Sequence, residues 1–166
     1  NSITLNVNGE IIAQAQDGIF ITEVKYLESA YADINNSKII NANQNNLQSR
    51  IVLEKTSDAY ISYQVTIYNS TNHDYEFERI KSLKCADNIN CDTYTNNNIQ
   101  VIPSITKGEI INAKKYLTFN ITFSYSDLTN INNTVLESVI NFLFTEVNKT
   151  YLVNGLELNA KIKNIE

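Results

Sequence analysis

Strict alternation of apolar and polar residues is the feature of this sequence that most limits its fold. Between Leu117 and Tyr125, apolar residues occupy every second position, and Thr, Asn and Ser fill the positions between them. The segment Ala59–Tyr68 repeats the pattern, with apolar residues at alternate positions from Ile61 to Ile67. Successive side chains of a β-strand point to opposite faces. This period of two therefore predicts strands with one face on a core and the other toward solvent.

Shorter apolar runs predict more strands of the same kind. They are Ile3–Val7, Ile11–Ala15, Ile19–Tyr26, Gln48–Lys55, Tyr75–Leu83, Ile99–Ile102, Val139–Thr145 and Leu156–Ile162. The Asn-rich segments Ile34–Asn46 and Thr93–Asn98 are predicted to be connectors, because Asn adopts turn conformations readily. One helical turn is predicted near Asn130–Ser138, and no long segment has a period of 3.6 residues.

Many short strands separated by turn signals are typical of all-β proteins. We expect a β-sandwich of the jelly-roll or immunoglobulin-like type. A chain of 166 residues is long enough to bury one hydrophobic core, and no linker or internal repeat divides it. A single domain over residues 1–166 is therefore predicted.

Charge and hydropathy limit the partners that this chain can have. Its formal net charge is −5, and no basic cluster is present to neutralise phosphates, so we expect no nucleic-acid partner. No stretch approaches the roughly 20 apolar residues that span a bilayer, so no membrane span is expected. The first residue is Asn1 rather than Met, which favours a processed, secreted product, although a trimmed segment would look the same.

The two cysteines, Cys85 and Cys91, lie in the polar, turn-rich segment KCADNINCDTY. A disulfide between them would close a short loop and contribute about 2 kcal/mol by the loop-entropy model. Such a bond persists in oxidising compartments, which fits an extracellular protein. Two free thiols and a metal site are the alternatives. Two Cys and one His cannot complete a tetrahedral zinc site without carboxylates, and we expect no metal.

The sequence contains no recognisable catalytic group. Its single histidine, His73, lies in the turn-like segment STNHDYEF, and no G-x-S-x-G motif supplies a nucleophile. No phosphate-binding glycine loop occurs among only four glycines, and the segment from Asp87 to Asn90 is only a fragment of a calcium-binding loop. We expect no enzyme activity and no cofactor, and we interpret His73 as a solvated loop residue.

Residues 1–8 form a candidate donor strand. The alternating segment consists of Ser2, Ile3, Thr4, Leu5, Asn6 and Val7. It is followed by Asn8-Gly9, a dipeptide favoured in tight hairpin turns. A short strand at a free terminus can pair within its own domain or can add to the exposed sheet edge of a neighbour. The sequence leaves both possibilities open.

Four sequence blocks follow one another in an order that resembles a known group of secreted proteins. The blocks are QDGIFITEV (Gln16–Val24), AYISYQVTIYNSTNHDYEF (Ala59–Phe77), ITKGEIINAKKYLTFNITFSY (Ile105–Tyr125) and VLESVINFLF (Val135–Phe144). This order resembles secreted surface proteins of clostridia and related Firmicutes. It is also similar to the exported proteins of the TasA/camelysin group, which a SipW-type signal peptidase cleaves.

The resemblance covers most of the chain and implies a fold and a function. It implies a jelly-roll sandwich that is exported to the cell surface of a Gram-positive bacterium. It also implies assembly into a biofilm fibre by donor-strand exchange, in which the N-terminal strand of one subunit completes the sheet of the next. We therefore expect a non-catalytic, extracellular structural subunit that forms a pilus-like homopolymer.

The alternative is a monomeric surface adhesin that recognises glycans or a host protein. Tyr60 and Tyr68 fall outside the inward register of their strand, and exposed aromatic rings can stack on sugars. Tryptophan, the usual leading residue of sugar-binding platforms, is missing from the chain. Aromatic side chains that cover the outer face of a strand explain the two tyrosines more simply.

Overall fold

The computed structural model describes residues 2–7, 10–15, 18–82, 94–96, 99–129, 134–153 and 156–161. Within these ranges the chain forms β-strands and no helix, which confirms the all-β class. In chain order the strands are β1 (Ser2–Val7), β2 (Glu10–Ala15), β3 (Ile19–Ala30), β4 (Lys38–Asn43), β5 (Asn46–Val52), β6 (Tyr60–Asn69), β7 (Tyr75–Ser82), β8 (Tyr94–Asn96), β9 (Ile99–Pro103), β10 (Ile110–Ile111), β11 (Tyr116–Tyr125), β12 (Val135–Glu146), β13 (Asn148–Val153) and β14 (Leu156–Lys161).

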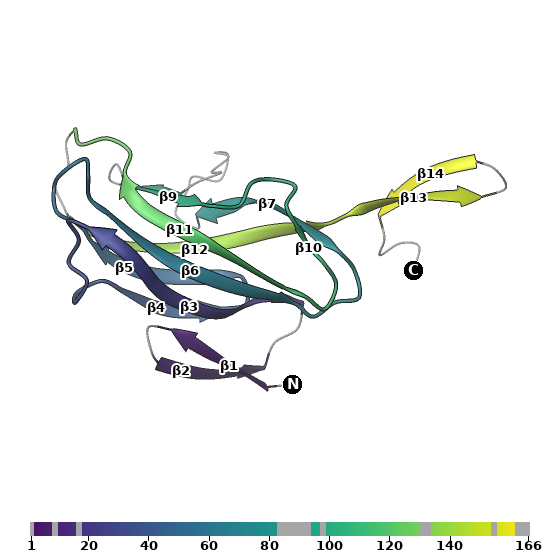
Figure 1. Ribbon diagram of the computed structural model, residues 1–166, viewed down its shortest axis with the longest axis horizontal. Coiled ribbons are helices and arrows are strands. Elements are labelled where there is room, and N and C mark those ends of the chain that lie inside the picture. The colour runs from purple at the N-terminus through teal and green to yellow at the C-terminus, as the bar shows by residue number, and fades with distance from the viewer. Residues whose placement is uncertain are drawn as a thin grey trace.

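Two sheets pack against each other as a β-sandwich (Figure 1). The first sheet has the order β2-β1-β3-β6-β11-β9-β8, and the second has the order β10-β7-β12-β5-β4. From β3 to β12, only the hairpins β4–β5 and β8–β9 stay within one sheet, and the other connections between described strands cross to the opposite sheet. Neighbouring strands are thus often distant in sequence, and the core forms only when both sheets come together.

Two hairpins lie at the periphery of this sandwich. The β1–β2 hairpin lies beside β3 in the first sheet. The β13–β14 hairpin forms a separate two-stranded sheet that follows β12 and extends away from the sandwich (Figure 1). A two-stranded hairpin is at best marginally stable in water.

Each strand predicted from the sequence corresponds to an observed strand, although several bounds differ by a few residues. Four strands were not predicted: β4, β8, β10 and β13. The strand β4 falls inside a predicted connector because a bulge between Ile39 and Asn41 interrupts its alternation. The strands β8 and β10 have only three and two residues, which is too short for a period of two to be recognised.

The prediction of a helical turn near Asn130–Ser138 is wrong for the part of this segment that the structure describes. The strand β12 already begins at Val135. The start of this strand is not recognisable from the sequence, because the polar residue Ser138 occupies an inward position and interrupts the apolar alternation. There its hydroxyl forms a hydrogen bond with the hydroxyl of Ser49 on β5 (Oγ to Oγ, 2.7 Å), and both residues are buried.

The hydrophobic core lies between the sheets and is centred on β6 and β11. Their antiparallel register pairs Val65 with Phe119 and Ile61 with Phe123, and all four side chains are buried. The inward rows predicted for the two strands are therefore confirmed. Burial of one large aliphatic or aromatic side chain contributes about 1.5–3 kcal/mol, so these rows are a major source of the stability of the fold.

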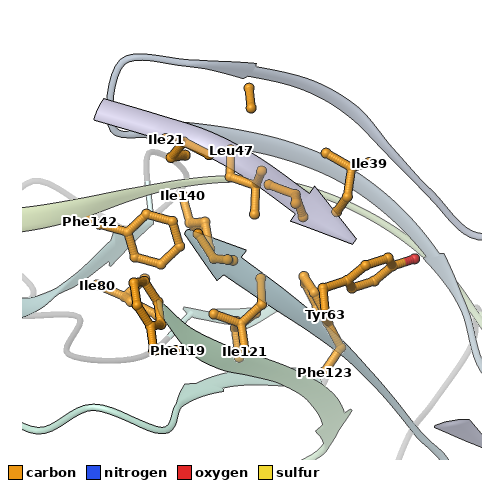
Figure 2. Close-up of a cluster of buried hydrophobic side chains, with 14 of the residues drawn as sticks. Ile21, Ile39, Leu47, Tyr63, Ile80, Phe119, Ile121, Phe123, Ile140 and Phe142 are labelled. Atoms are coloured by element: carbon orange, nitrogen blue, oxygen red, sulfur yellow. The ribbon is translucent and has the colours of Figure 1, made fainter. Parts of the chain in front are cut away.

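Aromatic side chains connect the two sheets across this core. Phe119 of β11 contacts Phe142 of β12 edge to face, with ring centroids 5.2 Å apart. In Figure 2, Ile140 and Phe142 of the second sheet face Phe119 and Ile121 of the first. At one border of the core, the hydroxyl of Tyr125 donates a hydrogen bond to the carbonyl of Leu53 over 3.3 Å. These contacts fix the position of one sheet on the other.

Asn69, the last residue of β6, joins three segments of the chain. Its side chain is fully buried, and Nδ2 donates to the carbonyls of His73 (2.7 Å) and Ile111 (3.1 Å). Its Oδ1 accepts hydrogen bonds from the amide (3.0 Å) and hydroxyl (2.6 Å) of Thr71. The side chain thereby holds the turn after β6 against the end of β10.

We expect Asn69→Ala to lower the free energy of unfolding by about 3 kcal/mol, because one buried and three partly buried hydrogen bonds are lost. Chemical denaturation measures this change. The matched control is Asn72→Ala, which removes the same side chain from an exposed position in the same turn and should change stability by less than about 0.5 kcal/mol. Equal losses in the two variants would contradict this role of Asn69.

Tyr63 makes stability sensitive to alkaline pH. Burial, with a smaller effect of nearby Tyr26, raises the pKa of Tyr63 from 10.0 to about 12. The unfolded chain therefore loses the phenol proton at a lower pH than the folded chain does. The stability that this difference contributes is complete below about pH 10 and is lost as the pH rises toward about pH 12.

We expect the free energy of unfolding of Tyr63→Phe to fall less steeply with rising pH than that of the unsubstituted chain, between about pH 10 and about pH 12. Denaturant unfolding at several pH values across this window tests the prediction. Tyr116→Phe is the control because Tyr116 is 65% exposed, and this variant should keep the full alkaline loss of stability. An unchanged slope in Tyr63→Phe would refute the prediction.

Candidate functional site

The predicted donor strand, β1, is paired within its own chain in this structure. It forms six antiparallel register pairs with β2, from Ser2 with Ala15 to Val7 with Glu10. It also forms a parallel contact with β3, limited to the pairs of Asn6 with Glu23 and Val7 with Val24. The hairpin pairing that the sequence allowed is thus observed, and the exchange of β1 between subunits stays a prediction.

Strand lengths explain why the hairpin leaves part of β3 uncovered. The strand β3 has 12 residues, whereas β1 and β2 have six each. The hairpin pairs with β3 at Glu23 and Val24, close to its own turn end. Near the start of β3, the amide of Ile21 donates to the carbonyl of Gln44 in the β4–β5 turn (2.8 Å). The hairpin therefore covers at most the first half of β3.

The second half of β3, Lys25–Ala30, has an open edge. It pairs with β6 on one side, and within the described residues no strand pairs with it on the other side. Four consecutive residues, from Lys25 to Glu28, are exposed, including Tyr26 and Leu27. A bulge between Tyr26 and Glu28 leaves Leu27 without a register partner on β6, and this side chain is 42% exposed. We refer to Lys25–Ala30 as the open edge of β3.

Apart from β2, the outer strand of the N-terminal hairpin, the edge strands of the two sheets are short or interrupted. In the first sheet β8 has three residues, and in the second sheet β10 has two. The edge strand β4 contains a bulge at Ile40 and begins with Lys38. Short strands, bulges and lysines at a sheet edge all oppose pairing with another chain. The open edge of β3 also contains a lysine, Lys25, and a bulge, but it directly continues the part of β3 that β1 already contacts, so it is the sandwich edge next to the strand that could be exchanged.

The outer face of the first sheet contains both tyrosines that the sequence singled out. Tyr60 and Tyr68 are half-buried there, at opposite ends of β6. Tyr68 lies between two other rings, with centroid distances of 5.9 Å to Phe20 and 4.6 Å to Tyr116. The sequence prediction missed Tyr116 because it started the strand one residue later, at Leu117. Extending the same alternation by one position would have found it.

His73 lies in the turn between β6 and β7, as predicted, but it is half-buried rather than fully solvated. The predicted disulfide residues Cys85 and Cys91 lie outside the described residues, as does the candidate calcium segment at Asp87. Among the residues that the structure does describe, no three His, Cys, Asp or Glu side chains lie close enough together to hold a metal ion.

An open pocket of about 170 Å³ lies at one end of the sandwich. Its lining consists of Gly18, Ile19, Asn45, Thr71, Tyr75, Phe142 and Phe144. Beside it, the hydroxyl of Tyr75 donates to Oε1 of buried Glu146 over 3.2 Å. Burial, followed by the charge of Glu146, raises the pKa of Tyr75. Small-molecule sites usually have volumes of about 300–1,000 Å³, so this pocket is small for an organic ligand.

Comparison with protein-family models, with characterised proteins and with solved structures found no significant match to this chain. In the described part of the chain there is no helix of the length and hydrophobicity required to cross a membrane.

Proposed function

We propose that this protein is a non-catalytic, extracellular structural subunit that assembles with copies of itself into a surface or biofilm filament by exchange of the N-terminal strand β1. The observation that carries the proposal is the open edge of β3 next to a hairpin that is too short to cover it. Secretion and the surface location are supported by the sequence resemblance to exported Firmicutes surface proteins.

Exchange has a physical rationale in the pairing of β1. In its own chain this strand contacts β3 through only two register pairs, because the hairpin limits its reach. A strand donated by a neighbour is not limited in this way and can extend along Lys25–Ala30. The two register pairs made with β3 in one arrangement are replaced by similar pairs in the other, and the six pairs with β2 are kept where β2 moves together with β1, so such an exchange itself costs little. The additional pairs along the open edge favour the assembled state.

The direction of assembly follows from the two elements involved. The donor β1 and the acceptor edge of β3 are different parts of the surface, so the contact is head to tail rather than between identical patches. Head-to-tail contacts produce a filament when the rotation between subunits does not close a ring. Every internal subunit would donate one strand and accept one.

We expect Leu27→Lys to reduce filament formation by at least about tenfold, because a lysine on an accepting edge opposes strand addition. Sedimentation velocity and negative-stain electron microscopy measure the polymer fraction. Ile40→Lys is the matched control: it makes the same change at a bulge on β4, where Ile40 is 38% exposed against 42% for Leu27. The control should assemble normally.

Mixing experiments separate the donor from the acceptor. A chain without residues 1–8 retains the acceptor edge but lacks the donor, so small amounts of it should cap filament ends and shorten the filaments of the full chain. Leu27→Lys subunits should cap the opposite end. The proposal is wrong if the full chain stays monomeric at all concentrations, or if Leu27→Lys and Ile40→Lys impair assembly equally.

A further inference from the structure

The outer face of β6 and β11 presents an unusual row of uncharged side chains. The ten outward positions are Tyr60, Ser62, Gln64, Thr66 and Tyr68 on β6, and Tyr116, Thr118, Asn120, Thr122 and Ser124 on β11. We refer to these ten residues as the neutral strip. The chain has 31 charged residues, the sum of 13 Lys and Arg and 18 Asp and Glu, yet none of them occupies the strip.

The interior of the neutral strip is a hydrogen-bonding surface. Hydroxyl groups pair across the two strands, Ser62 with Thr122 at 2.7 Å and Thr66 with Thr118 at 3.0 Å, and of these Ser62 is buried. Between these pairs lie Gln64 and Asn120, which are cross-strand register partners. Among the described residues no hydrogen bond to either side-chain amide is present, and both side chains are partly exposed. Two adjacent amides thus offer donors and acceptors to a ligand.

One end of the neutral strip is an aromatic platform. Tyr116 is 65% exposed, and its ring lies 4.6 Å from that of Tyr68 at an interplanar angle of 39°. Phe20 is almost completely buried and contacts the other side of Tyr68 edge to face at 5.9 Å. These contacts hold Tyr68 in place before any ligand arrives, which reduces the entropy cost of binding.

We propose that the neutral strip is a binding site for an uncharged, linear polysaccharide. The Tyr68–Tyr116 platform stacks against one sugar ring, and Gln64 and Asn120 bond the hydroxyls of a following one. The platform and the amide pair are four positions apart, about 13 Å along a strand, which is the length of a short oligosaccharide. The site is independent of the open edge of β3.

The chemistry of the strip favours a sugar over a protein partner. Protein interfaces have apolar cores, whereas the strip between Tyr60 and Tyr68 contains only hydroxyl and amide groups. A polysaccharide carries hydroxyls along its length and can pair with such groups while its ring faces stack on tyrosine. The absence of Lys and Arg from the strip disfavours acidic polysaccharides. Charged residues border the strip on β3, where the register partners of Thr66, Gln64 and Ser62 are Glu23, Lys25 and Glu28. At the aromatic end, exposed Lys115 precedes Tyr116.

The experiment is a binding assay on the full chain with four neutral polysaccharides, β-1,4-glucan, chitin, dextran and mannan, and two acidic ones, alginate and hyaluronan. Saturable binding to at least one neutral polysaccharide is expected. Tyr116→Ala and Gln64→Ala should each weaken it by about tenfold or more. The control Tyr31→Ala removes a tyrosine that is 56% exposed outside the strip and should leave binding unchanged.

Three outcomes would overturn the proposal: no binding to any neutral polysaccharide, binding to the acidic ones alone, or an equal loss in Tyr31→Ala. If Tyr116→Ala instead prevents self-association without any sugar being bound, the strip is a contact between copies. Thermal unfolding of each variant verifies that it folds. Because Leu27→Lys leaves the strip intact, sugar binding by that variant distinguishes failure of this site from failure of filament assembly.

Discussion

The antiparallel pairing of β6 with β11 is the constraint on which the rest of this structure depends. Its register runs without interruption from Tyr116 opposite Tyr68 to Ser124 opposite Tyr60. Because the side chains alternate, one face of the pair becomes the hydrophobic core, and the other becomes the uncharged outer face. A shift of one residue in this register would exchange the two faces and expose the core residues. Burial of the inner face therefore also determines which residues of the two strands lie on the outer face.

The second consequence of this central pair is the position of β3. It pairs with β6 along its whole length, with bulges after Ile21 and Tyr26, and its 12 residues exceed the reach of the hairpin on its other side, whose strands have six residues each. This mismatch in length, rather than a specific side chain, creates the open edge. The edge and the neutral strip therefore depend on the same sheet, but they present different chemistry: unpaired backbone in one case and hydroxyls, amides and aromatic rings in the other.

The agreement between sequence and structure is uneven, and the reasons are physical. The two most regular strands were predicted almost to the residue, because an uninterrupted period of two has no competing interpretation. The strand β4 was missed because a bulge breaks that period, and the start of β12 was missed because Ser138 is an inward polar residue whose partner, Ser49, lies 89 positions away in sequence. Local patterns cannot show such a pair. Asn69 is a similar case, since an Asn at a strand end suggests only a turn until its bonds to His73 and Ile111 are seen.

By itself, the sequence determined the all-β class, the inward faces of the central strands and the capacity of Ser2–Val7 to form a strand, because all three follow from alternation within a few residues. Only the tertiary structure decided the order of the strands, the partner of β1 and the position of the open edge of β3. These features depend on contacts between segments far apart in the chain and on the relative lengths of strands that the sequence does not mark. The same is true of the neutral strip, because Gln64 and Asn120 become neighbours only when β6 and β11 pair.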